Sequence, residues 1–117
     1  MPDYVLALAV HTHPSGASVL SLTGELDYHT APRLCRTVEK LSLDAATPLV
    51  LEVSSLLFCD SIGVTALLFA YRHALAASAP FAVAGAGKDL AQIFEITGID
   101  RLFDLHEDVD RALAAIG

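Results

Sequence analysis

The sequence predicts an α/β fold: a mixed, mostly parallel sheet that opens with a β-hairpin and is covered by about four helices. Two strand-like runs separated by a turn open the chain, and from there apolar strands alternate with amphipathic helices to the end. Such alternation is typical of parallel strands joined by helical crossovers. With 117 residues the chain has room for one hydrophobic core, so we expect residues 1–117 to form a single domain.

The opening hairpin is predicted from residues 4–10 (YVLALAV) and 18–24 (SVLSLTG). Both runs are rich in residues that favour strands, and the segment between them contains Pro14, Ser15 and Gly16, which favour a turn. The simplest arrangement of two strands joined by so short a connection is an antiparallel pair.

The first helix is predicted over residues 29–41, where Thr30 is a candidate N-cap and Pro32 falls in the first turn. Apolar residues then recur at helical spacing: Leu34, Val38 and Leu41.

The central strand is predicted over residues 48–53 (PLVLEV), which are apolar almost throughout, as in a strand covered on both faces. Glu52 is the exception, because a buried carboxylate is costly unless it is paired. We expect its side chain either to point toward an end of the sheet or to meet a basic partner.

The remaining elements are a helix from Ser61 to about residue 75, a strand over 80–85, a helix over 88–98 that ends at Gly98, a short strand over 101–105 and a helix over 107–116. The inward faces of the first and last of these helices are predicted to carry Val64, Leu67, Leu68, Tyr71 and Leu75, and Val109, Leu113 and Ile116, respectively.

Charge and hydropathy exclude two kinds of partner. The formal net charge is −7, from 14 acidic residues and 7 lysines plus arginines, so a phosphate backbone is repelled and direct nucleic-acid binding is not expected. Although 54% of the residues are hydrophobic, no apolar run approaches the roughly 20 residues that span a membrane. The amino terminus carries an acid where a signal peptide carries basic residues, which favours a cytoplasmic protein without membrane insertion.

Cysteines and histidines give no metal site. Cys35 and Cys59 lie far apart in the sequence and fit reduced, partly buried residues. His11 and His13 form an H-x-H pair without a third ligand nearby, whereas zinc requires three or four.

Catalytic motifs are also missing. The segment GAGKDL at residues 85–90 has the lysine of a phosphate-binding loop, but residue 82 is alanine and Asp89 follows the lysine, so the pattern fails. Ser61 lacks the G-x-S-x-G context of a hydrolase nucleophile. We therefore assign no catalytic residue and no cofactor.

The junction of Asp60 and Ser61 is the candidate functional site. It lies where the central strand ends and a helix begins, the place where functional groups gather in open α/β sheets. A phosphate on Ser61 would sit near the positive end of a helix dipole and beside the charge of Asp60. Gly63, in the first turn, is expected to leave room for a partner to approach the backbone. An ordinary helix cap is the alternative interpretation.

Two motifs resemble the STAS domain of bacterial anti-sigma factor antagonists. The segment SLTGELDYHTAPRL contains a GELD-type loop, and LEVSSLLFCDSIGVTALL contains a strand-terminal D-S-x-G motif. Residues FAVAG and LAQIFEITGIDRLFDL resemble the later strands and the third helix of that family, so the resemblance covers the chain from about Tyr4 to Ile116.

The resemblance implies a phosphorylation switch at Ser61. In that family the serine after the motif aspartate is phosphorylated by a partner anti-sigma factor, which is a serine kinase. The unphosphorylated domain binds this kinase and frees the sigma factor, and a PP2C-type phosphatase restores binding. The docking surface carried over by position consists of Glu25, Asp27, His29, Asp60, Ser61, Ile62 and Gly63.

Ile62 departs from the family pattern, which has a small hydroxylated residue there, so kinase recognition or partner identity is expected to differ. Two alternatives stay open. The domain is a STAS subunit of a stress-signalling complex or of a lipid-transport ABC system, or, less in keeping with the opening hairpin, an aspartyl-phosphate receiver.

Overall fold

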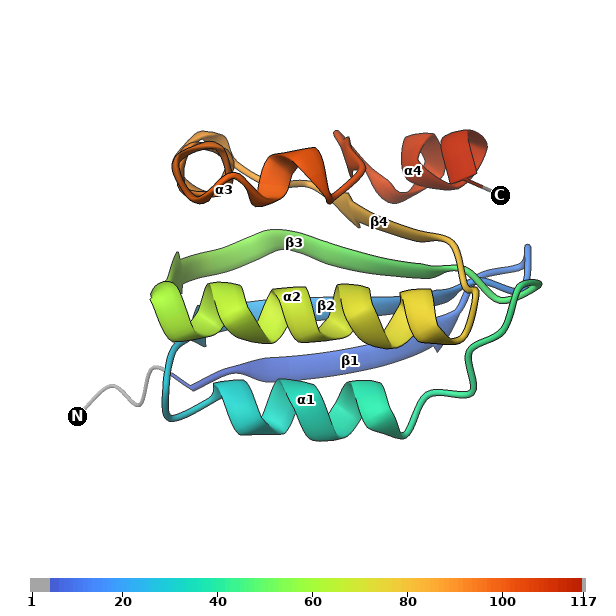
Figure 1. Ribbon diagram of the computed structural model, residues 1–117, viewed down its shortest axis with the longest axis horizontal. Helices are drawn as coiled ribbons and strands as arrows, with labels where there is room; N and C mark the ends of the chain where they lie inside the picture. Colours follow the sequence, from blue (N-terminus) through green and yellow to red (C-terminus); the bar gives the residue numbers. More distant parts are fainter. Residues whose placement is uncertain (1–4, 117) are drawn as a thin grey trace.

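The computed structural model describes residues 5–116, which form one five-stranded sheet, four α-helices and a short 3-10 helix (Figure 1). The elements in chain order are β1 (Ala7–Thr12), β2 (Ser18–Leu26), α1 (Ala31–Glu39), β3 (Leu49–Cys59), α2 (Ser61–Ala76), β4 (Phe81–Ala84), α3 (Lys88–Thr97), η1 (Ile99–Arg101), β5 (Leu105–His106) and α4 (Val109–Ile116).

The sheet has the strand order β1-β2-β3-β4-β5. β1 pairs antiparallel with β2, and every later pair is parallel. The predicted fold class, a mostly parallel sheet opened by a hairpin, is therefore confirmed. Tyr4, the predicted start of the first strand, lies outside the described residues, and β1 extends further along the chain than predicted, to Thr12.

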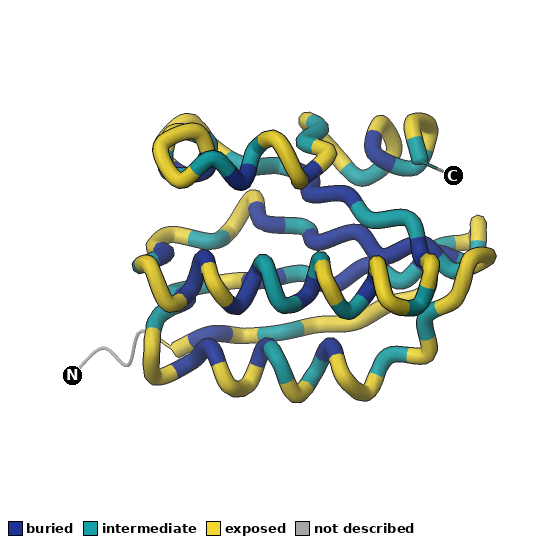
Figure 2. Tube along the Cα trace, in the orientation of Figure 1, coloured by how far each residue is buried: buried dark blue, intermediate teal, exposed yellow. Residues whose placement is uncertain are grey.

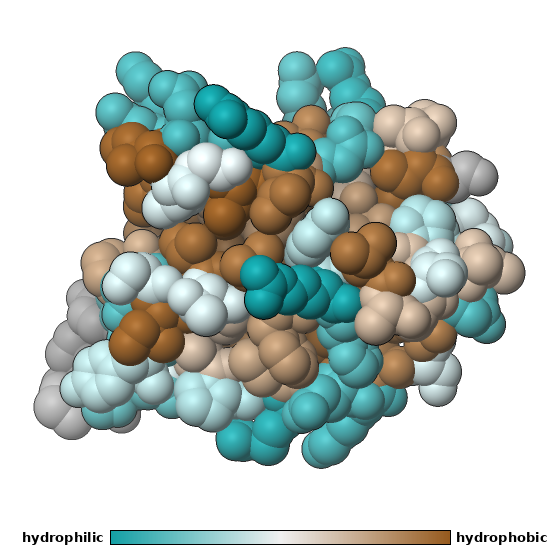
Figure 3. Space-filling view, viewed as in Figure 1, coloured by the Kyte–Doolittle hydropathy of each residue, from teal (hydrophilic) through white to brown (hydrophobic). Residues whose placement is uncertain are grey.

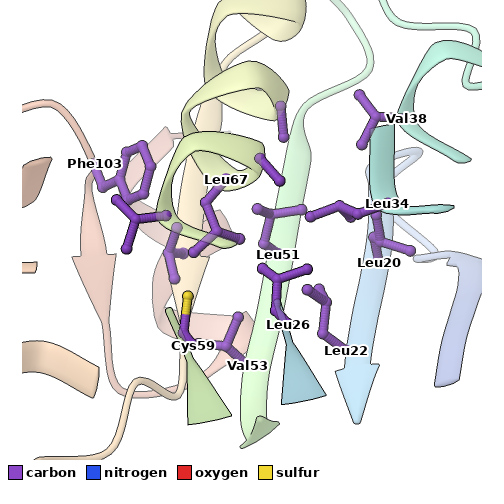
Figure 4. Close-up of a cluster of buried hydrophobic side chains, with 14 of the residues drawn as sticks. Leu20, Leu22, Leu26, Leu34, Val38, Leu51, Val53, Cys59, Leu67 and Phe103 are labelled. Atoms are coloured by element: carbon purple, nitrogen blue, oxygen red, sulfur yellow. The ribbon is translucent and has the colours of Figure 1, made fainter. Parts of the chain in front are cut away.

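The hydrophobic core lies mainly between the sheet and α1, α2 and α3. In Figure 4, side chains from β2, β3, α1 and α2 point toward one another, and Phe103 closes the cluster at one side. A second, smaller cluster lies on the opposite face of the sheet, under α4. It consists of small residues that allow this helix to approach closely: Val19, Val50, Ala82, Ala84 and Ala112, with Val109, Leu113 and Ile116 packed at its edge.

The predicted face of α2 is partly wrong. Val64 and Leu67 are buried as expected, but Leu75 is 61% exposed. Alanines occupy the buried positions instead (Ala66, Ala70 and Ala74). Short side chains at these positions let α2 lie close to the sheet and to α1, so the larger leucine is turned toward solvent.

The predicted bounds of two strands are also wrong. The last strand is limited to Leu105 and His106, because residues 99–101 form the 3-10 helix η1 instead. β3 continues six residues beyond the predicted end at residue 53, to Cys59. Opposite β2, its register shifts twice: β3 advances three residues from Glu52 to Ser55 while β2 advances two, from Ser21 to Thr23.

These irregularities expose the second half of β3. A shifted register breaks the alternation of inward and outward side chains. As a result, Ser54 and Ser55 are both exposed, and so are Leu57 and Phe58. Figure 2 shows β3 changing from buried to exposed toward the end that leads into α2.

Candidate functional site: the corner between β3 and α2

Asp60 closes the first turn of α2. Its backbone is extended (φ −88°, ψ −176°), and its Oδ1 accepts a hydrogen bond of 2.7 Å from the backbone N–H of Gly63. This is the N-cap geometry that stabilises a helix start. The alternative interpretation of the Asp-Ser junction, an ordinary helix cap, is thus correct for Asp60. Because Asp60 makes the capping hydrogen bond, the Ser61 side chain is not needed for it.

Ser61 is exposed at the first helical position of α2. Its backbone carbonyl accepts a hydrogen bond of 3.1 Å from the Thr65 hydroxyl. Within residues 5–116 its own hydroxyl makes no hydrogen bond to another protein group. The residue is therefore accessible from solvent.

The GELD loop lies directly beside this corner. Leu26 is paired with Cys59 in the parallel ladder of β2 and β3, and the Asp60 N–H donates a hydrogen bond of 3.2 Å to the Leu26 carbonyl. The two motifs, separated by more than thirty residues in sequence, therefore meet at the carboxyl ends of adjacent strands.

Gly63 serves internal packing rather than partner access, which corrects the prediction. The residue is buried, and a Cβ there would overlap the carbonyl oxygen of Leu26 and lie 2.9 Å from the Cys59 Sγ. Only glycine lets the first turn of α2 lie this close to the end of β2.

Asp27 and Thr30 hold the loop in shape. Asp27 Oδ1 accepts hydrogen bonds from the N–H groups of His29 (2.9 Å) and Thr30 (3.1 Å). The Thr30 hydroxyl turns backward, donating to the Glu25 carbonyl (2.9 Å) and accepting from the Asp27 N–H (2.9 Å). Thr30 occupies the N-cap position as predicted, but its side chain makes no capping hydrogen bond to α1. It is buried, and its role is to close the loop.

Four large apolar side chains around the corner are exposed: Tyr28 (60% exposed), Leu57 (77%), Phe58 (49%) and Ile62 (49%). Ile62 belongs to the docking surface carried over from the resemblance, whereas Tyr28, Leu57 and Phe58 were not predicted. The rings of Tyr28 and His29 lie 3.9 Å apart. Exposed apolar side chains gathered in this way are typical of surfaces that bind another molecule. Leu57 and Phe58 lie beyond the predicted end of the central strand at residue 53, and the register shifts that turn both outward cannot be read from the sequence.

A groove of about 490 Å³ adjoins the corner, between the second half of β3 and the start of α3. Its lining residues are Ser54, Leu56, Leu57, Phe58, Cys59, Gly87, Lys88, Asp89, Leu90 and Ile93. On the face of the molecule seen in Figure 3, a further apolar surface lies between α2 and α3.

Cys59 lies beneath the corner and is not a reactive thiol. Burial, and secondarily the nearby Asp60 carboxylate, raise the pKa of Cys59 to about 12. The thiolate is the nucleophilic form of cysteine, so this residue stays inert near neutral pH. Cys35 and Cys59 are both free thiols.

The structure decides between the two expectations for the Glu52 side chain, an end of the sheet or a basic partner. It lies opposite Ala84, the last residue of β4, and its Oε1 accepts hydrogen bonds from the N–H (3.3 Å) and the hydroxyl (2.9 Å) of Ser54. Its carboxylate thus lies at a sheet end, and within the described residues no basic side chain pairs with it. The alternative of a basic partner is wrong.

Within the part of the chain that the structure describes, the two histidines considered as metal ligands, His11 and His13, do not form part of a metal site. His13 is engaged by Ser15 (2.9 Å) and lies 3.7 Å from Asp110, while His11 lies in β1. Across residues 5–116 no three His, Cys, Asp or Glu side chains are grouped so as to hold a metal ion. In the same range no helix combines the length and hydropathy that crossing a bilayer requires.

The fold and the corner define a small α/β domain whose main surface feature is an accessible serine bordered by acidic and apolar side chains. This chain belongs to the STAS domain family, which matches residues 9–112.

Two proteins that are similar to this chain are anti-sigma factor antagonists, and a third shares its fold. The anti-sigma-F factor antagonist RsfB of Mycobacterium tuberculosis is 30% identical over 115 residues, which cover 98% of this chain and 92% of RsfB. A crystal structure of an anti-sigma factor antagonist from Mycobacterium paratuberculosis superposes with a TM-score of 0.81 at 27% identity, covering 98% of this chain and 97% of that one. The Bacillus cell fate determinant SpoIIAA in its phosphorylated form shares the fold, with a TM-score of 0.68 and 17% identity over 93% of this chain and 98% of SpoIIAA.

Proposed function

We propose that this protein is an anti-sigma factor antagonist switched by phosphorylation of Ser61. In its unphosphorylated form it binds an anti-sigma factor and thereby frees a sigma factor. The observation that carries the proposal is the exposed Ser61 hydroxyl at a corner tied to the GELD loop, in a chain similar to anti-sigma factor antagonists over 98% of its length.

The docking surface comprises Glu25, Asp27, His29, Asp60, Ser61 and Ile62 with the exposed apolar residues Tyr28, Leu57 and Phe58. Apolar side chains supply the contact area, and the acids select a partner with basic groups. Gly63 contributes indirectly, since its close packing fixes the position of Ser61 relative to Leu26.

Phosphorylation acts on this surface through charge and size. A phosphate on Ser61 adds about −1.5 to −2 charges beside Asp60, on a chain whose net charge is already −7. The Gly63 N–H is already bonded to Asp60, and Ser61 is exposed, so the phosphate extends from the surface toward the partner. Repulsion and steric exclusion then both weaken docking.

The partner supplies the chemistry in this mechanism. The anti-sigma factor is a serine kinase that holds ATP, and a PP2C-type phosphatase reverses the modification. The protein itself is a cytoplasmic regulator without a catalytic residue or a cofactor of its own.

The test is phosphate transfer by the purified cognate anti-sigma factor with ATP. Intact-mass measurement is expected to show about one phosphate per chain, and Ser61→Ala is expected to abolish it. Thr65→Ala removes the next exposed hydroxyl along the helix and serves as the matched control that remains labelled. Labelling that persists in Ser61→Ala contradicts the assignment.

A pull-down separates this function from the two alternatives within the family. Recovery of an anti-sigma kinase with the unphosphorylated protein supports the proposal. Recovery of a transporter ATPase or of a multi-protein stress-signalling scaffold replaces it.

A further inference from the structure

The second half of β3 has an open edge. β4 pairs with β3 only from Leu49 to Glu52, whereas β3 continues to Cys59. β2 covers the opposite edge over the whole of this length. Figure 1 shows this part of β3 running past the end of β4, beside α3. Among the described residues, no backbone–backbone hydrogen bond from outside the sheet ladders reaches residues 54–58. The Ser54 N–H bonds the Glu52 side chain at 3.3 Å, so the open part of the edge begins after Ser54.

Gly85 creates this opening. Its backbone is left-handed (φ +83°), and an added Cβ would lie 2.7 Å from Glu52 Oε2 and 3.0 Å from the Ser54 Cβ. The chain therefore turns away from β3 directly after β4, at a position that requires glycine. The open edge is a defined consequence of the backbone path.

The groove between this edge and the start of α3 has room for a short extended segment. Its volume is about 490 Å³, and a strand advances about 3.3 Å per residue. One wall offers strand backbone, because β3 beyond Glu52 has no β4 partner for its edge N–H and C=O groups. The apolar lining is formed by Leu56, Leu57, Phe58, Leu90 and Ile93.

Charge selects the occupant. Among the described residues, the lining contains one acid, Asp89, and one cation, Lys88. Asp60 follows the far end of the groove, and the chain as a whole has a net charge of −7. A second copy of this acidic chain would bring like charges together. A segment that combines apolar side chains with basic ones complements the site.

We propose that this groove binds an extended segment of the partner anti-sigma factor, apolar with at least one basic residue, as an additional strand on β3. The proposal rests on the function proposed above and specifies how the partner is held. Addition of a strand to a free sheet edge gives affinity through main-chain hydrogen bonds and selectivity through side-chain pockets. Because the groove ends at Cys59, a strand bound there lies next to Asp60 and Ser61.

The experiment is hydrogen exchange of this protein, alone and with the purified cognate anti-sigma factor without ATP. Amides of residues 54–58 are expected to exchange more slowly in the complex. In parallel, Leu57→Asp is expected to weaken the affinity about tenfold or more. Ile96→Asp is the matched control, because Ile96 is equally exposed (76%) but does not line the groove. The melting temperature of both variants verifies folding.

The possible results separate the two proposals. Slower exchange at residues 54–58, with weaker binding only in Leu57→Asp, supports strand addition. A complex in which these amides exchange as fast as in the free protein overturns strand addition and leaves the antagonist function intact. An equal loss of affinity in Leu57→Asp and Ile96→Asp overturns strand addition as well. If the wild-type protein forms no complex, the proposed function itself fails, and strand addition fails with it.

Discussion

The N–H of Asp60 donates a hydrogen bond to the carbonyl of Leu26, at 3.2 Å. This bond continues the ladder of β2 and β3 one residue beyond the sheet. It fixes the first turn of α2 against the GELD loop, so the two motifs form one rigid corner.

Replacement of Gly63 by alanine is expected to lower the free energy of unfolding by about 1–3 kcal/mol. The added Cβ overlaps the Leu26 carbonyl and the Cys59 sulfur, so the corner has to open. Urea unfolding at neutral pH measures the effect. Ser61→Ala, two residues earlier, is the control and is expected to change stability by less than about 0.5 kcal/mol, because the serine hydroxyl is exposed. If the wild-type protein, Gly63→Ala and Ser61→Ala have the same free energy of unfolding, close packing at Gly63 does not contribute to stability.

Thr30→Val is expected to cost about 1–3 kcal/mol of stability. The substitution preserves shape but removes a buried hydroxyl that bridges the Glu25 carbonyl and the Asp27 N–H. Thr65→Val provides the comparison, since that hydroxyl is exposed and bonds only a helix carbonyl. A loss in Thr65→Val as large as in Thr30→Val would show that burial is not the cause.

Stability is expected to decline at alkaline pH because of Cys59. Burial raises the pKa of this thiol from an ordinary 9.0 to about 12. Between these values the unfolded chain loses a proton that the folded chain keeps. The contribution is therefore complete below pH 9.0 and is lost as the pH rises toward 12. Urea midpoints at about pH 8 and about pH 10.5 should differ more for wild type than for Cys59→Ala. The same decline in both proteins would refute this origin.

Ile62→Asp is expected to weaken binding of the cognate anti-sigma factor about tenfold or more without unfolding the protein. Ile62 is 49% exposed beside Ser61, so the aspartate adds charge to the proposed docking surface. Leu75→Asp, at an exposed position near the other end of α2, should bind as wild type. Calorimetric titration measures both affinities. If Leu75→Asp is the weaker binder, the docking surface has been placed at the wrong end of the helix.

Much of the architecture follows from local patterns. The hairpin turn at residues 14–16, the proline at the start of α1 and the glycine after α3 each act on neighbouring residues, so their consequences can be predicted from sequence. The position of Asp60 before α2 belongs to the same class. Ser61 could be chosen as the candidate site because the change from strand to helix period falls at this residue.

The features that could not be predicted depend on contacts between distant segments. Leu57 and Phe58 resemble buried strand residues, and only the register against β2 turns them outward. From the sequence, Gly63 is expected to leave room for a partner; only the fold shows that the Leu26 carbonyl occupies this space. Leu75 continues a helical stripe, but the alanines beside it decide which face of α2 approaches the sheet.

The self-contained cap at Asp60 has an evolutionary consequence. Because that carboxylate alone completes the first turn, folding places no demand on the side chain that follows it. Under the proposed function, a single codon change at position 61 would therefore convert a reversible signal into a permanently active or permanently silent protein, while the rest of the domain stays under unchanged selection. Paralogous regulators with different logic can arise from such a scaffold without passing through an unstable ancestor.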